Sequence, residues 1–267
     1  NLNLFSGEGN LVDNRDETWT FTPSEDWTGD VKFSYNVFDY SNLKLFGNSL
    51  YTIVDGPSWD EASNQSISLG GNLVSINSAK ENQWLIDNFG NNPDLLLDNG
   101  HTDVHIGLEY KNSQFTWPDG TKFPAYNEII NPHLTGVEGT SVTLHLDLPN
   151  SDTNTYVGTG IPPYVGSWEI GTPPAMAGIA EIPYYQFGDS IYIELGNSSW
   201  EDAQANAEKL GGNLVSINSQ AEQEFIFNTF ASTDDGDIGK WIGFTDKDQE
   251  GTWKWTDGSE VEYLNWN

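Results

Sequence analysis

The nine residues GGNLVSINS occur twice in this chain, at residues 70–78 and again at residues 211–219. The similarity continues on both sides of the repeated stretch. SLYTIVDGPSW precedes the first occurrence where SIYIELGNSSW precedes the second, and FTWPDG (115–120) is later matched by WKWTDG (253–258). A similarity that extends this far indicates an internal duplication of a whole domain, so both copies are expected to fold in the same way.

Each repeated stretch predicts one secondary-structure element. LYTIV and IYI are rich in β-branched and aromatic residues and are typical of short strands. Four serines, each three residues before an acid, match the capping box that begins a helix: Ser58 with Glu61, Ser78 with Glu81, Ser199 with Asp202 and Ser219 with Glu222. The GG pair supplies the left-handed backbone that ends the first helix of each copy. LVSI predicts a buried strand. The order strand, helix, strand, helix and strand-rich half predicts an α+β fold.

Together these landmarks resemble the C-type lectin-like domain, in the cysteine-free form found in large bacterial surface and secreted proteins. The landmarks are the W-x-x-A helix, GG-x-L-V-x-I, E-x-x-x-[FL], W-I-G and W-x-W-x-D-G. The resemblance implies C-type lectin-like modules in tandem: a first domain at 47–183, a linker at 184–188 and a second, incomplete domain at 189–267. The second copy reaches LNWN where the long loop of the family begins, so we expect it to lack its closing strand.

Residues 1–46 follow a different pattern. In WTFTPSEDWTGDVKFSYNVFD (19–39) apolar residues alternate with the period of a half-buried strand. The stretch resembles the C-terminal part of a cadherin-like or immunoglobulin-like β-sandwich. Domains of this kind occur in tandem in bacterial giant adhesins. Asp26, Asp30 and Asp39 are candidate calcium ligands between domains, and solvated turn acids are the alternative interpretation.

The charge of the chain restricts its partners. Asp and Glu number 40 against 10 Lys and Arg, which gives a formal net charge of −30. Nucleic acid and anionic membranes are excluded as expected partners because their binding requires clustered cations. Calcium, which prefers oxygen ligands, is the expected cofactor, and simple solubility in a salty medium is the alternative interpretation of the acidic charge. The chain has no cysteine, which excludes disulfides and thiolate metal sites, and no apolar run is long enough to predict membrane insertion.

In C-type lectins, sugar hydroxyls bind directly to a calcium held by the long loop and a W-N-D strand. Trp168-Glu169-Ile170 stands where W-N-D is expected, and Ile170 cannot ligate a metal. The loop YNEIINPHLTGVEG (126–139) also lacks the family's E-P-N motif. The resemblance therefore implies an altered oxygen site, with these candidate ligands: Glu128, Asn131, Glu138 and Glu169.

A second calcium site of the family joins a Glu at the start of the second helix to a Glu on the closing strand. Glu81 and Glu181 match these positions in the first copy, and Glu222 matches Glu81 in the second. A capping box explains Glu81 and Glu222 equally well without a metal. It does not explain Glu181, an acid inside the apolar strand IAEIP.

The long-loop region, around residues 126–176, carries aromatic side chains among Gly, Pro and Thr. An exposed aromatic platform there would favour sugar stacking or peptide recognition. Five residues are the candidate ligand-binding side chains: Tyr126, His133, Tyr156, Tyr164 and Trp168.

The sequence contains no catalytic motif, so we expect no enzyme. The best hypothesis is a secreted or cell-surface segment that mediates calcium-dependent adhesion to a carbohydrate or protein ligand on another surface. The alternative is a structural module whose partners are neighbouring domains or chains of the same surface layer, filament or matrix. Ice binding is a third possibility, but the flat Thr-rich face that it needs is not visible in the sequence.

Overall fold

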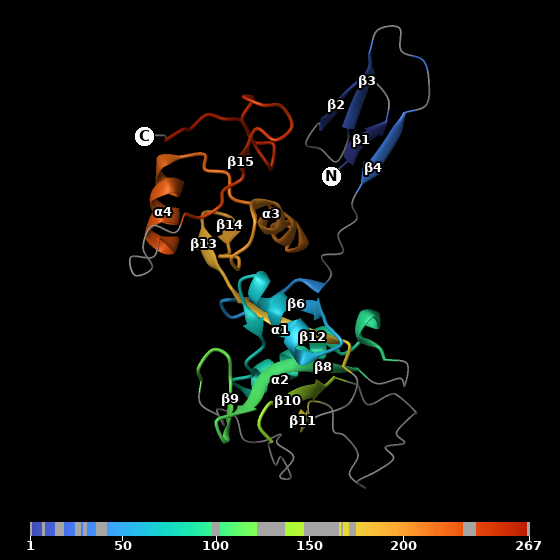
Figure 1. Ribbon diagram of the computed structural model, residues 1–267, viewed down its shortest axis with the longest axis vertical. Helices are drawn as coiled ribbons and strands as arrows, with labels where there is room; N and C mark the ends of the chain where they lie inside the picture. The colour runs from blue at the N-terminus through green and yellow to red at the C-terminus, as the bar shows by residue number, and fades with distance from the viewer. Residues whose placement is uncertain are drawn as a thin grey trace. The chain divides into compact units, whose positions relative to one another are not determined.

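The chain divides into two compact units, Asn1–Asp39 and Tyr40–Asn267. The computed structural model in Figure 1 describes residues 2–6, 9–13, 19–24, 28, 31–35, 42–97, 102–121, 137–146, 166, 168–170, 175–231 and 239–265. Within these ranges, no helix has both the length and the apolar character needed to cross a membrane.

The first unit consists of short antiparallel strands in the part of the chain that the structure describes. They are β1 (Leu2–Ser6), β2 (Gly9–Asp13), β3 (Trp19–Pro23) and β4 (Lys32–Tyr35). β1 pairs with β4, and β2 pairs with β3. The strand predicted from the alternating apolar residues near position 33 is therefore present as β4.

The first repeat, predicted at residues 47–183, is built on an eight-stranded sheet (Figure 1). Its strands are β5 (Lys44–Phe46), β6 (Ser49–Asp55), β7 (Asn72–Leu73), β8 (Asp103–Lys111), β9 (Gln114–Thr116), β10 (Thr140–His145), β11 (Trp168–Ile170) and β12 (Ala177–Pro183). The strand order is β11-β10-β8-β12-β6-β5, with β7 beside β12 and β9 beside β8. Lys44–Phe46 pairs with β6, so the sheet begins before the predicted boundary at residue 46.

The last strand of this repeat closes the sheet. β12 runs antiparallel to β6 along its whole length, from Ala177 opposite Asp55 to Pro183 opposite Ser49. On its other side β12 is parallel to β8 at a single pair, Gly178 and His105. β6 and β12 are therefore neighbours in the sheet although more than a hundred residues separate them in the sequence.

Two helices cover this sheet, and both begin as the sequence predicts. α1 (Trp59–Ser68) has Ser58 as its N-cap, and the Ser58 side chain accepts a hydrogen bond from the Glu61 backbone N–H. α2 (Ala79–Phe89) has Ser78 as its N-cap in the same geometry, and a short 3₁₀ turn, η2 (Pro93–Leu95), follows it. Such a cap satisfies one backbone donor that the first turn of a helix leaves free.

The apolar side chains of the first repeat form two buried clusters. The larger one contains Tyr51, Ile76, Leu85 and Ile106, and Trp84 packs against it. The smaller one contains Ala62, and Trp59 packs against it. Both helices are therefore held mainly by burial of their apolar faces, which is the dominant favourable contribution to folding.

The second repeat, predicted at residues 189–267, shows the same elements in its described part. They are β13 (Tyr185–Phe187), β14 (Ser190–Tyr192), α3 (Trp200–Lys209), α4 (Gln220–Phe230), β15 (Phe244–Thr245) and β16 (Lys254–Trp255). Ser199 and Ser219 cap the two helices, as predicted. β13 pairs with β14 in the register that relates β5 to β6.

The run LVSI departs from its prediction. Leu73, Val74 and Ile76 are buried as expected, but only Asn72 and Leu73 form a strand. The backbone of Val74 makes one hydrogen bond on each side, its N–H to the Ile179 carbonyl and its carbonyl to the Gly107 N–H, at 2.9 Å each. Val74 is therefore buried and hydrogen-bonded to β12 and β8 although it is not part of a regular strand.

Candidate functional site

A tyrosine hydroxyl joins two glutamates where β6, α2 and β12 meet. The hydroxyl of Tyr51 on β6 lies 2.7 Å from Oε1 of Glu81 on α2 and 3.1 Å from Oε1 of Glu181 on β12. The backbone N–H groups of Asn77 and Ser75 donate to the other carboxylate oxygens, at 2.8 Å to Glu81 and 3.2 Å to Glu181. Each of the four carboxylate oxygens therefore accepts a hydrogen bond from the protein.

Further polar groups extend this cluster to the surface. The carboxamide of Asn77 donates to Asp119 at 3.4 Å, and the Thr121 hydroxyl donates to both side chains. Asn77 and Asp119 are exposed, whereas Tyr51 and Glu81 are buried. The cluster is thus a polar column that runs from the core to the surface at the N-terminus of α2.

The column is strongly acidic for a buried site. Burial raises the pKa of Glu81, and the nearby Glu181 and Asp119 raise it further, while the hydrogen bonds from Asn77 and Tyr51 lower it. Burial also raises the pKa of Tyr51, to which the charges of Glu181 and Glu81 add. Tyr51 therefore stays a neutral hydrogen-bond donor, which is the form that two adjacent carboxylates require.

The second repeat contains the same contacts. The Tyr192 hydroxyl donates to Oε1 of Glu222 at 2.7 Å, and the Asn218 N–H donates to Oε2 of Glu222 at 2.8 Å. Burial raises the pKa of Tyr192 as well, followed by the effect of Glu222. In the part of the second repeat that the structure describes, no residue takes the place of Glu181.

The tryptophans that open α1 and α3 also have equivalent surroundings. The Trp59 indole N–H donates to the Ile106 carbonyl at 2.8 Å, and the Trp200 indole N–H donates to the Ile242 carbonyl at 2.9 Å. The first bond joins the start of α1 to H-I-G (105–107) in β8, and the second joins the start of α3 to W-I-G (241–243), which directly precedes β15. The two halves thus share their glutamate, tyrosine and tryptophan contacts.

Comparison with known families agrees with this geometry. The Lectin C-type domain family matches residues 55–158 and again residues 196–267, about two thirds of the chain. The chain belongs to the C-type lectin domain family. A Cadherin-like domain family matches residues 1–54. The first match confirms the predicted α+β C-type lectin fold, and the second confirms the predicted cadherin-like N-terminal segment. The relatives reported below are lectins and not enzymes, in agreement with the expectation from the sequence.

The most similar curated proteins include ladderlectin from Oncorhynchus mykiss, which is 38% identical over 84 residues, 31% of this chain and 44% of that protein. The galactose-specific lectin nattectin from Thalassophryne nattereri is 38% identical over 71 residues, 27% of this chain and 45% of that protein. The chain thus spans less than half the length of these relatives. Both come from fish, so the predicted bacterial source has no support among them.

Solved structures of C-type lectins resemble the chain over about half its length. The carbohydrate-recognition domain of cow CD23 is 17% identical, with a TM-score of 0.37 over 53% of this chain and 93% of that one. The lectin CEL-IV is also 17% identical, with a TM-score of 0.40 over 56% of this chain and 96% of that one.

The carboxylates of Glu81 and Glu181 are suitable calcium ligands, but their oxygens are already hydrogen-bonded without a metal ion. Carboxylates are the ligands that calcium prefers, but calcium takes six to eight oxygens. Within the described ranges, no three His, Cys, Asp or Glu side chains are grouped closely enough to hold a metal ion. Glu81 and Glu181 would hold a calcium here together with carbonyl, amide or water oxygens.

The other predicted calcium ligands are not brought together by the described structure. Glu138 is exposed in the turn before β10 and accepts a hydrogen bond from the Asn112 N–H at 3.2 Å. β11 places Glu169 opposite Thr143. The remaining candidates lie outside the described residues: Glu128, Asn131, Asp26, Asp30 and Asp39.

Among the predicted ligand-binding aromatics, only Trp168 lies within the described residues, and the structure places it in the core. Its side chain is 1% exposed, and its indole N–H donates to Asn82 at 3.0 Å. The prediction of a surface role for Trp168 is therefore wrong, because pairing with Leu144 on β10 turns this position toward α2. Four candidates lie outside the described residues: Tyr126, His133, Tyr156 and Tyr164.

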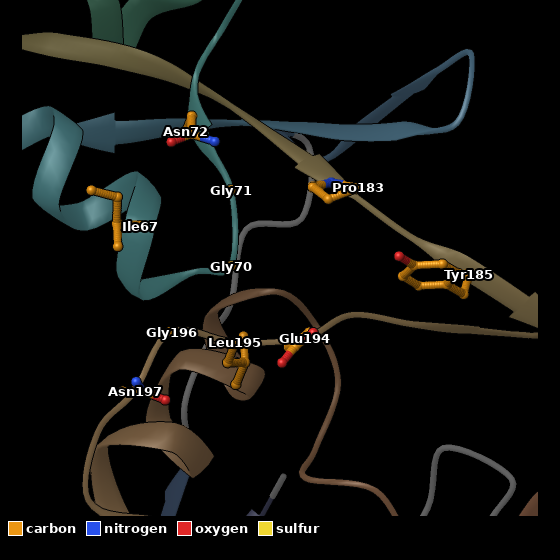
Figure 2. A pocket seen from close by; sticks show the side chains of 10 residues that line it. All are labelled: Ile67, Gly70, Gly71, Asn72, Pro183, Tyr185, Glu194, Leu195, Gly196 and Asn197. Carbon is orange, nitrogen blue, oxygen red and sulfur yellow. The ribbon is translucent and has the colours of Figure 1, made fainter. Parts of the chain in front are cut away.

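A hollow of about 410 Å³ lies where the turn after α1 meets residues 194–197. Figure 2 shows Gly70, Gly71 and Asn72 on one side and Leu195, Gly196 and Asn197 on the other. A Cβ at Gly70 would lie 1.9 Å from the Glu194 carbonyl oxygen, so only glycine allows this approach. The one acid in the lining, Glu194, pairs with Lys240, which leaves no free charged group to recognise a ligand there.

Sequence reasoning identified Glu81, Glu181 and Glu222 but missed their partners. Tyr51 carries the contact that joins the two glutamates of the first repeat, and Asp119 extends the cluster outward. Both residues could have been found from the repeat, because the same residue type recurs at the equivalent position. Tyr51 aligns with Tyr192, and Asp119 aligns with Asp257 in the D-G turns. Polar residues that recur inside apolar strands are candidates for buried networks.

Proposed function

We propose that this chain is an extracellular recognition segment in which two C-type lectin domains follow a cadherin-like domain, as in bacterial surface adhesins. It binds a carbohydrate or protein ligand on another surface, and carbohydrate is the better-supported class. The domains are proposed at residues 47–183 and 189–267, after a cadherin-like part at 1–46 and with a linker at 184–188. β5 and β13 lie just before these boundaries and pair with β6 and β14, so each lectin domain also includes the strand that precedes it. The segment acts at a cell surface or in the secreted medium.

The observation that carries this proposal is the family match at residues 55–158 and 196–267. Nattectin, one of the relatives, is described as galactose-specific. The proposed sugar site lies in the long-loop region of the first domain, with Tyr126, His133, Tyr156 and Tyr164 as stacking side chains. Sugar sites of this size bind weakly, so two domains in one chain would strengthen attachment through multivalency.

Calcium is the proposed cofactor. One ion would bind between Glu81 and Glu181, where it would link α2 to the closing strand β12 and stabilise the fold that carries the long loop. A second would bind at the altered oxygen site: Glu128, Asn131, Glu138 and Glu169. The acidic composition of the chain, with a net charge of −30, supports cation binding, since bound cations reduce the repulsion between like charges.

A glycan array probed with the full chain, with calcium and with a chelator, tests this function. We expect binding to a defined set of glycans and its loss in chelator. Thermal unfolding in the same two conditions tests the structural ion, since a ligand that binds only the folded state raises the Tm. Glu181→Gln is expected to abolish the calcium-dependent Tm shift, and Asp189→Asn, in the exposed turn between β13 and β14, to retain it.

An assembly role is the second candidate function. Large apolar side chains of the second repeat are exposed, including Ile191, Phe227, Trp241 and Trp253. Large exposed apolar side chains are typical of protein interfaces where they lie together in one patch. No binding to any glycan, together with mass measurements that show oligomers of the chain, would favour assembly over recognition.

A further inference from the structure

The C-terminal end of α1 in the first lectin repeat lies against the second repeat. Ser68 is the last residue of α1, and its carbonyl oxygen accepts two hydrogen bonds from the second repeat. The Gly196 N–H donates at 3.2 Å, and the carboxamide of Asn206 on α3 donates at 3.3 Å. The last carbonyl groups of a helix have no partner within the helix, so the second repeat satisfies a group that α1 leaves free.

Two glycines bring the backbones of the two repeats into close contact. A Cβ at Gly196 would lie 2.4 Å from the Ile67 carbonyl oxygen, and a Cβ at Gly70 would lie 1.9 Å from the Glu194 carbonyl oxygen. Figure 2 shows the turn at Gly70 beside the segment that contains Gly196. Each repeat therefore contributes one glycine whose missing side chain makes room for the backbone of the other.

Apolar side chains of the second repeat complete this contact. Ile193 and Leu210 are partly buried and pack against the smaller apolar cluster of the first repeat, which contains Leu69 and Ile182. Removal of apolar side chains from water is favourable in proportion to the area buried. Both repeats accordingly belong to one compact unit, Tyr40–Asn267.

The two copies differ in sequence where they meet. Ile193 of the second repeat stands in place of Thr52, and Gly196 stands in place of Asp55. An aspartate at the position of Gly196 would direct a side chain at the Ile67 carbonyl, which leaves no room for a Cβ. The second repeat thus carries residues that fit the end of α1 and that the first repeat lacks. A contact between two such different surfaces is directional.

We propose that this contact is a specific interaction surface whose partner is the second lectin repeat, and that it joins the two repeats into one rigid unit. The stretch 184–188 between them is then a fixed connection. Its first residue, Tyr184, donates its backbone N–H to the Asn48 carbonyl at 3.3 Å. The next three residues form β13 (Tyr185–Phe187), which pairs with β14.

A rigid pair of lectin repeats would present its recognition surfaces at one separation. Sites joined by a flexible stretch adapt to ligands at many spacings, whereas fixed sites gain from multivalency only where the spacing of the ligands matches their own. This consequence rests on the proposed recognition function. The contact itself does not depend on that function, and it can be tested without any ligand.

Double electron–electron resonance of the full chain measures how rigid the pair is. Because the chain has no cysteine, Asp87→Cys and Asn228→Cys place one spin label on each repeat, at exposed and equivalent positions of α2 and α4. A flexible stretch of the length of 184–188 has a root-mean-square span of about 12 Å, so freely moving repeats would give a distance distribution about that broad. We expect a single peak with a width well below this value.

Gly196→Val tests whether the contact at α1 holds the repeats together. The three atoms nearest to the added Cβ all belong to the first repeat, at Ile67 and Ser68. The valine should therefore separate the repeats without unfolding either, and we expect the distance distribution to broaden by about twofold or more. Gly239→Val, where an added Cβ meets nothing within 4 Å, is the matched control and is expected to keep the narrow peak.

Asn206→Ala is a second, milder variant. It removes one donor to the Ser68 carbonyl and places a good helix former on α3, so we expect a smaller broadening in a folded chain. Circular dichroism checks the folding of every variant.

A broad distance distribution in the unchanged chain would overturn the proposal. An unchanged narrow peak in folded Gly196→Val would overturn it as well, because another contact would then hold the repeats. If Gly196→Val does not fold, Asn206→Ala decides, and the absence of any broadening in that variant contradicts the proposal. Failure to bind any glycan would leave these distances unchanged, so the failure of the proposed function and the failure of this proposal are distinguishable.

Discussion

The hydroxyl of Tyr51 lies 2.7 Å from the carboxylate of Glu81 and links the first strand of the first repeat to its second helix. Tyr192 and Glu222 make the same contact at the same distance in the second repeat. The first pair is completed by Glu181 on β12, which accepts a hydrogen bond from the same hydroxyl. One phenol thus separates two carboxylates that would otherwise repel each other at close range.

Tyr51→Phe is expected to lower the free energy of unfolding by about 2 kcal/mol, because the buried carboxylate of Glu81 and the partly buried carboxylate of Glu181 lose a donor. Tyr192→Phe is expected to cost about 1 kcal/mol, since Tyr192 donates to one carboxylate at a more exposed site. Urea denaturation in chelator, followed by tryptophan fluorescence, measures both effects. An equal cost for the two variants would mean that the bond to Glu181 contributes nothing.

Trp59→Phe is expected to lower the free energy of unfolding by about 2 kcal/mol, through the lost bond to the Ile106 carbonyl and the lost packing. Trp241→Phe is the matched control. Its indole N–H also donates to a backbone carbonyl, that of Ser198, but the side chain is 57% exposed. We expect the control to cost less than about 0.5 kcal/mol in the same denaturation experiment. Similar losses in both variants would contradict an anchoring role for Trp59.

The repeat made the local structure of this chain predictable. Helix starts at Ser58, Ser78, Ser199 and Ser219 follow from the capping pattern, because a cap depends on residues only three positions apart. The glutamates of the candidate site were also found, since a charged residue in an apolar strand such as β12 demands a partner. These patterns either involve residues that are close together in the sequence or occur in both repeats.

Contacts between distant residues were harder to predict. Trp168 was expected on a binding surface, but its strand pairs with β10 and directs the indole to Asn82. Nothing in the three residues WEI reveals which face of the sheet is covered. Tyr51 was read as a strand former, because an aromatic residue in a strand has the same pattern whether or not its hydroxyl has a partner.

Gly71→Ala is expected to lower the free energy of unfolding by about 2 kcal/mol or more, because the added methyl group would meet the backbone of β12. The strand is central in the sheet and cannot move away without loss of its pairing. Gly212→Ala is the same substitution at the equivalent position, where the nearest described atom to the added Cβ is the Ala207 carbonyl oxygen at 3.8 Å, and we expect a change below about 0.5 kcal/mol. Thermal and urea unfolding distinguish the two. A large loss for Gly212→Ala would show that the space beside this glycine is already filled.

The stability of the first repeat is expected to depend on pH through His105. This side chain on β8 is 7% exposed, and burial lowers its pKa from the ordinary value of 6.5, an effect that a contact with the Ala175 backbone partly opposes. Between the lowered pKa and 6.5 the unfolded state binds more protons than the folded state. The free energy of unfolding is therefore highest above pH 6.5 and falls as the pH drops through this window, by at most about 1.4 kcal/mol per pH unit.

His105→Gln removes this titration while keeping a polar side chain of similar reach. The difference in the free energy of unfolding between the unchanged chain and His105→Gln is expected to shrink as the pH falls from 7.5 toward 5, because only the unchanged chain loses stability through this group. Urea denaturation at several pH values measures the difference, and comparison of the two chains cancels the titration of the many acids. A difference that stays constant over this range would show that His105 has the same pKa in the folded and unfolded states.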